Sequence, residues 1–452
     1  MTKQVKERDP YKLTALKQIG WSGRAVSLAA NVIVLSYITF FCTNILGMDP
    51  ILVGTILLVT KIFDGVTDLF AGVLIDRTHT KMGKARPYEF AILGVWISTV
   101  LLFSCPDMGT VGKAIWVAVT YTFINSIFAT LLNASEAVYL RRGFKYENDR
   151  NTLISVNGLL VTLVATAVSI AFPIMMGTLG TTKGGWKVMI LITAIPLAII
   201  GMGRFLFVKE VNVDDDESNA EILHLKDIPP VLKNRYIWIL FAITFIANLI
   251  TNTNSAVGTY YFTYIVGDVT KMSLVGALGL ISPFALLLMP LLLKKVSLRK
   301  VFIFSFIMGI LGSVVKGFAG ANMVLIMVGS ILLTFASLPP AYFGLILVID
   351  VMEYHEWKTG NRVEGVISSV NGFASKIGSG VASAAVGLIM GLAGFDGTAA
   401  VISSSATNAI VALFCWIPAA LYAVSIILMK LFDLEEKLPA IKQELAERHA
   451  QQ

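Results

Sequence analysis

Long apolar segments recur along all 452 residues, and this feature restricts the possible fold more than any other. The chain is 56% hydrophobic and only 14% charged, whereas soluble domains carry about 25% charged residues. A helix that crosses a bilayer needs about 20 mostly apolar residues, so the chain has enough apolar sequence for about twelve. The runs are continuous, unlike the alternating strands of a membrane β-barrel. The sequence therefore predicts an all-α polytopic membrane protein.

The predicted spans lie near residues 20–46, 50–75, 88–105, 112–140, 152–177, 186–208, 236–264, 272–293, 301–318, 323–349, 363–393 and 406–432. Loops that follow even-numbered spans are rich in Lys and Arg, and the other loops hold few of them. Because cytoplasmic loops carry this excess, we expect both termini in the cytoplasm and the protein in the cell membrane.

The longest stretch between spans is 209–235, with six predicted spans on either side of it. This layout predicts two related six-helix bundles, residues 1–208 and 236–432. Residues 209–235 are then a cytoplasmic linker, and residues 433–452 a cytoplasmic tail that forms a short amphipathic helix.

Three charged residues, Lys61, Asp64 and Asp68, interrupt the second apolar segment. Counted back from Asp76, Asp64 lies roughly 18 Å and Asp68 roughly 12 Å inside the membrane. Their spacing places all three on one helix face. Charges at this depth are costly and mark ion or substrate paths. Two carboxylates one turn apart repel unless a hard cation or a proton lies between them. The other interpretation is a structural ion-pair network with lysines.

Polar residues also interrupt later spans. Thr130, Asn133 and Glu136 recur at every third position of the fourth span, and Thr130 lies roughly 16 Å deep, level with the aspartates. Lys376 of the eleventh span lies roughly 21 Å from its cytoplasmic end. Thr130 is also interpretable as a packing residue, because Ser and Thr are common contacts between membrane helices.

The seventh and tenth spans carry further interruptions. Asn248, Asn252 and Asn254 cluster in the seventh span, and Pro339-Pro340 interrupts the tenth. A helix break at membrane depth is typical of a transporter gate or of a packed kink.

Two long motifs, one in each half, resemble those of a known family. The first runs D-x3-D-x3-G-x3-D-R-T-x-T-K-x-G-K-x-R-P from Asp64 to Pro87. The second is DVMEYHEWKTGNRVEG from Asp350 to Gly365, followed by FASKIGSG. The chain resembles the glycoside–pentoside–hexuronide:cation symporters, the melibiose permease family of the major facilitator superfamily. The resemblance covers nearly the whole chain and implies twelve transmembrane helices in two six-helix bundles, the major facilitator fold.

The resemblance also implies roles for single residues. Asp64, Asp68 and Thr130 match the cation site, with the two aspartates as metal ligands if the coupling ion is Na⁺. The coupling ion is Na⁺ or H⁺, and no cofactor is expected. The expected substrate-binding residues are Arg24, Asn133, Tyr342 and Lys376. The expected coupling or gating residues are Lys61, Asp76, Arg77, Glu136 and Asp350.

The first span departs from the family pattern. The family usually has an acid there that hydrogen-bonds sugar hydroxyls, whereas Arg24 is the only charged residue between Gly20 and Leu46. If Arg24 faces the cavity, its guanidinium can hold a carboxylate through two hydrogen bonds. This favours an anionic sugar such as a hexuronide over a neutral one. If it instead snorkels to the interface, it does not contact substrate.

The sequence therefore predicts a secondary active transporter that couples a monovalent cation to a sugar or glycoside by alternating access. Membrane lipids are expected partners, and nucleic acid is not. One alternative is a lipid transporter of the same fold that moves lysophospholipids. The other is a membrane-embedded enzyme, which would need a nucleophile or metal constellation that the sequence does not display.

Overall fold

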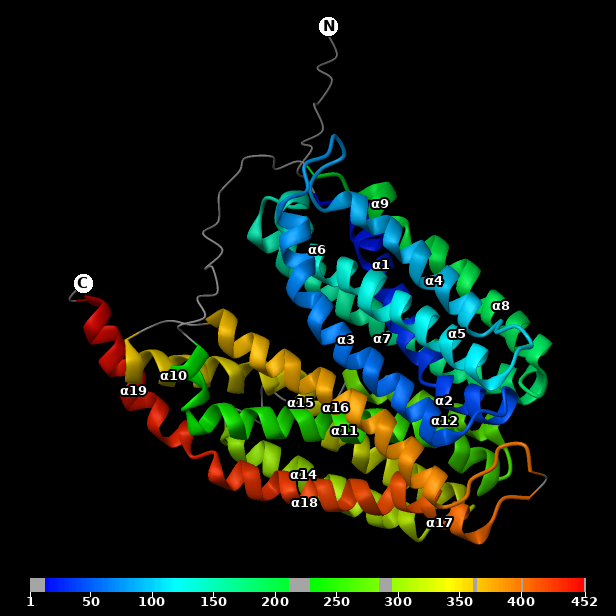
Figure 1. The fold of residues 1–452 in the computed structure, drawn as a ribbon. Coiled ribbons are helices and arrows are strands. Elements are labelled where there is room, and N and C mark those ends of the chain that lie inside the picture. The colour runs from blue at the N-terminus through cyan, green and yellow to red at the C-terminus, as the bar shows by residue number, and fades with distance from the viewer. Residues whose placement is uncertain (1–12, 211–227, 284–294, 361–363, 400, 451–452) are drawn as a thin grey trace, which may run out of the picture. The chain divides into compact units, whose positions relative to one another are not determined.

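The computed structural model describes residues 13–210, 228–283, 295–360, 364–399 and 401–450 (Figure 1). Within these ranges the regular elements are helices, apart from an isolated bridge between Thr80 and Gly83. Ten of the described helical segments are long and apolar enough to cross a membrane. The predicted third span is the shorter helix α4 (Ala91–Leu102). The predicted eighth span starts at α12 (Met272–Ala277) and runs into residues outside the described ranges. The predicted all-α polytopic class is confirmed.

The chain divides into two compact units, which are residues 1–35 with 63–218, and residues 36–62 with 219–452. The change of unit therefore falls inside the first and second predicted spans as well as between the sixth and seventh. The division of the sequence into two consecutive six-helix bundles stays a prediction.

Unit 1 contains α1 (Ala15–Leu35), the second part of α3 (Pro50–Asp76), η2 (Arg86–Phe90), α4, α5 (Thr110–Thr122), η3 (Phe123–Ala129), α6 (Thr130–Gly143), α7 (Glu147–Leu179), α8 (Lys183–Gly201) and α9 (Gly203–Phe207). Helix α1 packs against α7, α8 and α9, and α4 packs against η3 and α8. The apolar spans thus surround α1, which is buried along much of its length.

One end of unit 1 is closed by a small aromatic core. Trp21 contacts Tyr139 and Phe144 edge to face, with ring centroids 5.5 and 5.3 Å apart. The Tyr139 hydroxyl donates a hydrogen bond of 2.8 Å to the Val208 carbonyl, so its polar end is satisfied although the ring is buried. This core holds the ends of α1, α6 and α9 together.

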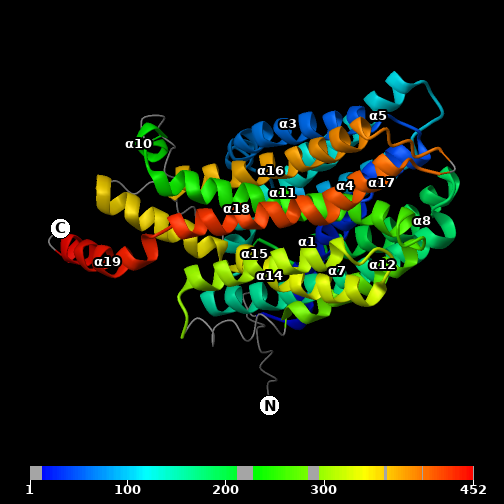
Figure 2. The same cartoon turned by 90° about the horizontal axis from the view of Figure 1, so that it is seen from below.

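Unit 2 contains α2 (Ile38–Phe40), η1 (Phe41–Ile45), the first part of α3, α10 (Ile228–Leu232), α11 (Arg235–Tyr264), η5 (Val269–Lys271), α12, η6 (Leu278–Leu280), α14 (Leu298–Gly317), α15 (Met323–Thr359), α16 (Glu364–Leu392), α17 (Ser404–Val411), η7 (Ala412–Trp416), α18 (Ile417–Leu431) and α19 (Leu434–Ala450). Helices α14 and α15 run side by side in Figure 2, and α11 packs along α16.

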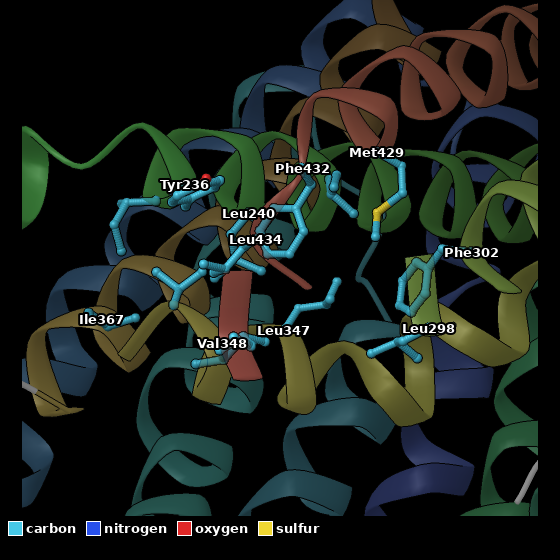
Figure 3. Close-up of a cluster of buried hydrophobic side chains, with 14 of the residues drawn as sticks. Tyr236, Leu240, Leu298, Phe302, Leu347, Val348, Ile367, Met429, Phe432 and Leu434 are labelled. Carbon is cyan, nitrogen blue, oxygen red and sulfur yellow. The ribbon is translucent and has the colours of Figure 1, made fainter. Parts of the chain in front are cut away.

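The core of unit 2 lies between α11, α14, α15 and α18 and extends to the tail helix α19 (Figure 3). Leu434, Leu438, Ile441 and Leu445 of α19 recur at helical spacing and are buried. This apolar stripe packs α19 against α15. The predicted helical tail is therefore part of the unit 2 core.

Candidate cation and substrate site

Two carboxylates converge on one hydroxyl in unit 1. Thr130 Oγ1 lies 2.8 Å from Asp68 Oδ1 and 3.2 Å from Asp64 Oδ1. A hydroxyl carries a single hydrogen, so it donates to one carboxylate at a time. Asp64 is only 6% exposed. The structure thus places together the three residues that were predicted to bind the cation.

The backbone before Thr130 supplies a fourth oxygen. Residues Phe123–Ala129 form a π-helix, a local widening that often occurs at functional sites. The carbonyl oxygen of Asn125 lies 3.2 Å from Thr130 Oγ1. The sequence did not predict this group, because a π-turn has no simple residue signature. Two carboxylates, a hydroxyl and a carbonyl form an all-oxygen set, which suits a hard cation or a proton.

Asn133 lies one turn after Thr130 on α6, and its side chain is exposed. Residues three apart share a helix face. The predicted substrate residue Asn133 therefore lies beside the oxygen set, on the same side of α6.

Arg24 lies in a buried charge cluster. It is 1% exposed, and its Nη1 donates to Glu89 Oε1 at 2.5 Å and to Ser135 Oγ at 3.3 Å. Its Nη2 pairs with Glu136. Arg204 also pairs with Glu136, at 2.6 Å, so two cations balance two carboxylates.

This arrangement bears on two predicted roles. Arg24 was expected to bind a substrate anion, but its guanidinium is buried against protein carboxylates, which favours a structural role. Glu136 was expected to act in coupling and is the acceptor shared by both arginines. The sequence did not single out Glu89 and Arg204, because they lie at span ends, where charges are common.

Four further predicted residues, Lys61, Tyr342, Asp350 and Lys376, lie in unit 2. A β-carbon at Gly380 of α16 would lie 3.1 Å from Lys61 Cβ, so Lys61 packs one turn away from Lys376. Tyr342 is 50% exposed on α15, and Asp350 on the same helix is buried.

The basic loop between the second and third spans folds around a carboxylate. Glu210 accepts backbone N–H bonds from Lys84 at 2.9 Å and from Ala85 and Arg86 at 2.7 Å each. Successive N–H groups of this kind form an anion-binding nest. Gly83 has φ +118°, and a β-carbon there would lie 2.4 Å from the Glu210 carboxyl carbon. The nest thus requires glycine at this position.

The predicted gating residues of this loop lie around the nest rather than in it. Asp76 ends α3, and its side chain lies outside the described residues. Arg77 is exposed. Arg86 donates to the Phe205 carbonyl at 2.8 Å, which ties the loop to the end of α9. Glu210 was not predicted, because its role depends on how the loop folds back.

Residues 21–436 match the family described as MFS/sugar transport protein. The chain belongs to this family. It is 30% identical to the isoprimeverose transporter of Lactiplantibacillus pentosus over 98% of this chain and 95% of the relative. It is 25% identical to the putative glycoside/cation symporter YagG of Escherichia coli (strain K12), over 92% of this chain and 91% of the relative.

The fold is that of the nucleoside transporter NupG, whose crystal structure matches with a TM-score of 0.63 at 15% identity, covering 92% of this chain and 100% of NupG. The predicted resemblance to the glycoside–pentoside–hexuronide:cation symporters is confirmed. The family consists of transporters, so the chain is a multi-pass membrane transporter and not an enzyme.

Proposed function

We propose that this protein transports a sugar or glycoside together with a monovalent cation, by alternating access. The observation that carries the proposal is the convergence of Asp64 and Asp68 on the Thr130 hydroxyl. The names of the relatives support the cargo class. The cation, Na⁺ or H⁺, is transported with the sugar.

The carboxylate pair supplies a physical basis for coupling. Two like charges this close repel each other, and a cation or proton between them relieves the repulsion. Asn133 lies one turn away, so a bound cation changes the charge beside the proposed sugar site. If the cation raises the affinity for sugar, the sugar must raise the affinity for the cation by the same factor.

The substrate that the charge cluster favours is uncharged. A hexuronide was expected because Arg24 adds positive charge near the substrate. Glu89 and Glu136 balance Arg24 and Arg204, so the cluster has no net charge. We therefore propose a neutral glycoside.

We place the transporter in the cell membrane with both termini in the cytoplasm, as the basic loops after even-numbered spans indicate. Membrane lipids surround the apolar spans. The alternative cargo, a lysophospholipid, would be expected to need a largely apolar path, whereas Asn133 and Lys376 are polar.

Uptake into proteoliposomes tests the proposal. Wild-type protein should accumulate at least one member of a labelled glycoside panel when an inward Na⁺ or H⁺ gradient is applied, and not without it. Asp64→Asn and Asp68→Asn should each abolish accumulation, because each removes an anionic oxygen while it preserves side-chain volume. Asp107→Asn is the matched control, since its side chain is exposed and pairs only with Lys183 among the described contacts.

Accumulation by both Asp64→Asn and Asp68→Asn would remove the cation site from the proposal. Gradient-driven uptake of lysophosphatidylcholine without uptake of any glycoside would replace the sugar with the lipid cargo.

A further inference from the structure

A cavity of about 530 Å³ lies inside unit 2, between α11, α14, α15, α16 and α18. It lies apart from the cation site of unit 1 in the sequence, and none of the predicted site residues lines it. Sites for small organic ligands typically measure about 300–1,000 Å³. The cavity is therefore large enough for a ring-sized chemical group.

One wall of the cavity is polar and uncharged. Its polar lining residues are Thr244, Asn248, Thr251, Ser337, Asn371 and Ser425. Thr244 donates to Asn371 Oδ1 at 2.6 Å, and Ser375 donates to Asn248 Oδ1 at 2.9 Å. These bonds fix both amides between α11 and α16. Among the described residues that line the cavity, none is charged.

The rest of the lining is part of the apolar core. Leu240, Phe302 and Leu347 come from three helices and belong to the buried cluster of Figure 3, and all three line the cavity. Phe306 and Tyr422 add two more aromatic rings. An apolar ring face packs well on such an aromatic wall, while hydroxyl or ether oxygens can bond to the lining amides.

The cavity adjoins predicted substrate residues. Asn371 precedes Lys376 by five residues, roughly 8 Å along α16. Ala341 and Gly344 line the cavity on α15 and flank Tyr342, which is exposed. Exposed residues on the lining, among them Thr251 and Ser337, place the opening between α11 and α15.

We infer that this cavity binds the uncharged group attached to the sugar of a glycoside, either an aglycone or a second sugar ring. The inference rests on the proposed function. Under this inference, unit 2 determines how long a substrate the protein accepts. Asn371 and the aromatic residues Phe302, Phe306 and Tyr422 set this limit. A charged group is excluded because no lining residue could compensate its charge, and burying an unpaired charge is costly.

Gly344 provides a way to fill the cavity without disturbing the helix. It lines the cavity, and a β-carbon at this position meets no atom within 4 Å. The series Gly344→Ala, Gly344→Leu and Gly344→Phe therefore adds volume step by step. Gly158→Phe is the matched control, because Gly158 of α7 in unit 1 also has no neighbour within 4 Å of an added β-carbon.

The experiment measures how methyl and phenyl β-glycosides of xylose, glucose and galactose compete with cation-driven uptake. Gly344→Phe should weaken competition by the phenyl glycoside by about tenfold, or about 1.4 kcal/mol, and leave the methyl glycoside of the same sugar unchanged. Gly344→Leu should weaken competition by the phenyl glycoside more than Gly344→Ala and less than Gly344→Phe. Gly158→Phe should match wild type. Asn371→Leu, which removes the amide but adds no aromatic bulk, should weaken competition by a disaccharide, whose second ring offers hydroxyls to the amide, and leave the methyl glycoside of the same sugar unchanged.

Equal losses for methyl and phenyl glycosides, or no loss in any variant that folds, would overturn the inference. A melting curve for each purified variant separates misfolding from loss of binding, and Asn371→Leu remains informative if Gly344→Phe does not fold. The proposed function fails separately, when wild-type protein shows no cation-driven uptake of any glycoside. If a lysophospholipid displaces the phenyl glycoside and no other glycoside does, the cavity is a lipid site and the assignment is overturned.

Discussion

At the scale of single residues, charge balance decides which groups remain available to a substrate. Arg24 and Glu89 are both buried, and Arg24 Nη1 donates to Glu89 Oε1 at 2.5 Å. A buried pair gives little net stability, but removal of one partner leaves an uncompensated charge. The Thr130 hydroxyl matters for a related reason, because it lies within hydrogen-bond distance of two carboxylates.

Arg24→Gln should therefore destabilise the protein by about 3–5 kcal/mol, because Glu89 is left buried without its partner. Arg24→Gln with Glu89→Gln should restore most of the stability, because neither charge then remains. Arg77→Gln, an exposed arginine, is the control. Denaturant or thermal unfolding of the purified wild type, Arg24→Gln, the double variant and Arg77→Gln gives the four stabilities. If Arg24→Gln is as stable as wild type but loses affinity for an anionic sugar, Arg24 binds substrate after all.

Thr130→Val should raise the cation concentration that gives half-maximal uptake by about tenfold or more, or about 1.4 kcal/mol, because the hydroxyl oxygen is lost as one of the oxygen ligands of the cation. Valine keeps the branched shape and removes only the oxygen. Thr130→Ser keeps the oxygen and should remain close to wild type. Cation titrations of uptake at fixed sugar give the comparison. An unchanged half-maximal concentration in Thr130→Val would exclude the hydroxyl from the cation site.

At the scale of secondary-structure elements, the two units repeat one clamp. In unit 1, Glu210 accepts the N–H groups of Ala85 and Arg86, and Arg86 donates to a carbonyl at the end of α9. In unit 2, Glu435 accepts the N–H groups of Leu298 and Arg299 at 2.7 and 2.8 Å. Arg299 donates in turn to the Met429 and Lys430 carbonyls.

In each clamp the arginine donates to a carbonyl that lies five residues before the glutamate. The carbonyl of Phe205 precedes Glu210 in unit 1, and that of Lys430 precedes Glu435 in unit 2. The repeated geometry agrees with two related halves. In each unit it anchors a loop or helix start to the end of that unit's last span. The basic motif is thus more than a set of topology charges, because its glycine and backbone shape the nest.

Glu435→Gln should loosen the start of α14, because an amide presents N–H groups to backbone donors in place of one carboxylate oxygen. Hydrogen exchange at Leu298 and Arg299 should become faster. Glu436→Gln is the adjacent control, since Glu436 is 73% exposed and forms a surface ion pair with Arg299. Equal exchange in the two variants would show that the Glu435 carboxylate does not hold the helix start.

At the scale of the whole molecule, helical periodicity and family motifs predicted the depth and the helix face of individual polar residues. Residue counts placed Asp64, Asp68 and Thr130 at matching depths, and the family resemblance assigned all three to one cation site. The partner of Arg24 and the Asn125 carbonyl depend on how helices pack and on a π-turn, which spacing does not encode. The compact units were also not predictable, because contacts of residues 36–62 decide which unit they join.

Those contacts include a close approach between α3 and α16 within unit 2. A β-carbon at Gly387 would lie 2.3 Å from the Pro50 carbonyl oxygen, and one at Gly54 would lie 2.8 Å from the Ser383 carbonyl oxygen. Small residues let membrane helices approach at backbone distance. The other half of α3 carries Asp64 and Asp68 and belongs to unit 1. One helix therefore joins this glycine contact to the proposed cation site.

Gly387→Val should force α3 and α16 apart, because adding bulk to a close contact costs about 1–3 kcal/mol. The packed state should lose population, and a thiol introduced by Ala384→Cys, beside Gly54, should react faster with maleimide. The native cysteines are buried and should react slowly. Gly365→Val on the same helix is the control, since an added β-carbon there has no neighbour within 4 Å. Cation-driven uptake should slow only in Gly387→Val, because alternating access needs both the packed and the separated state. If labelling and uptake in Gly387→Val match the control, this contact does not take part in the transport cycle.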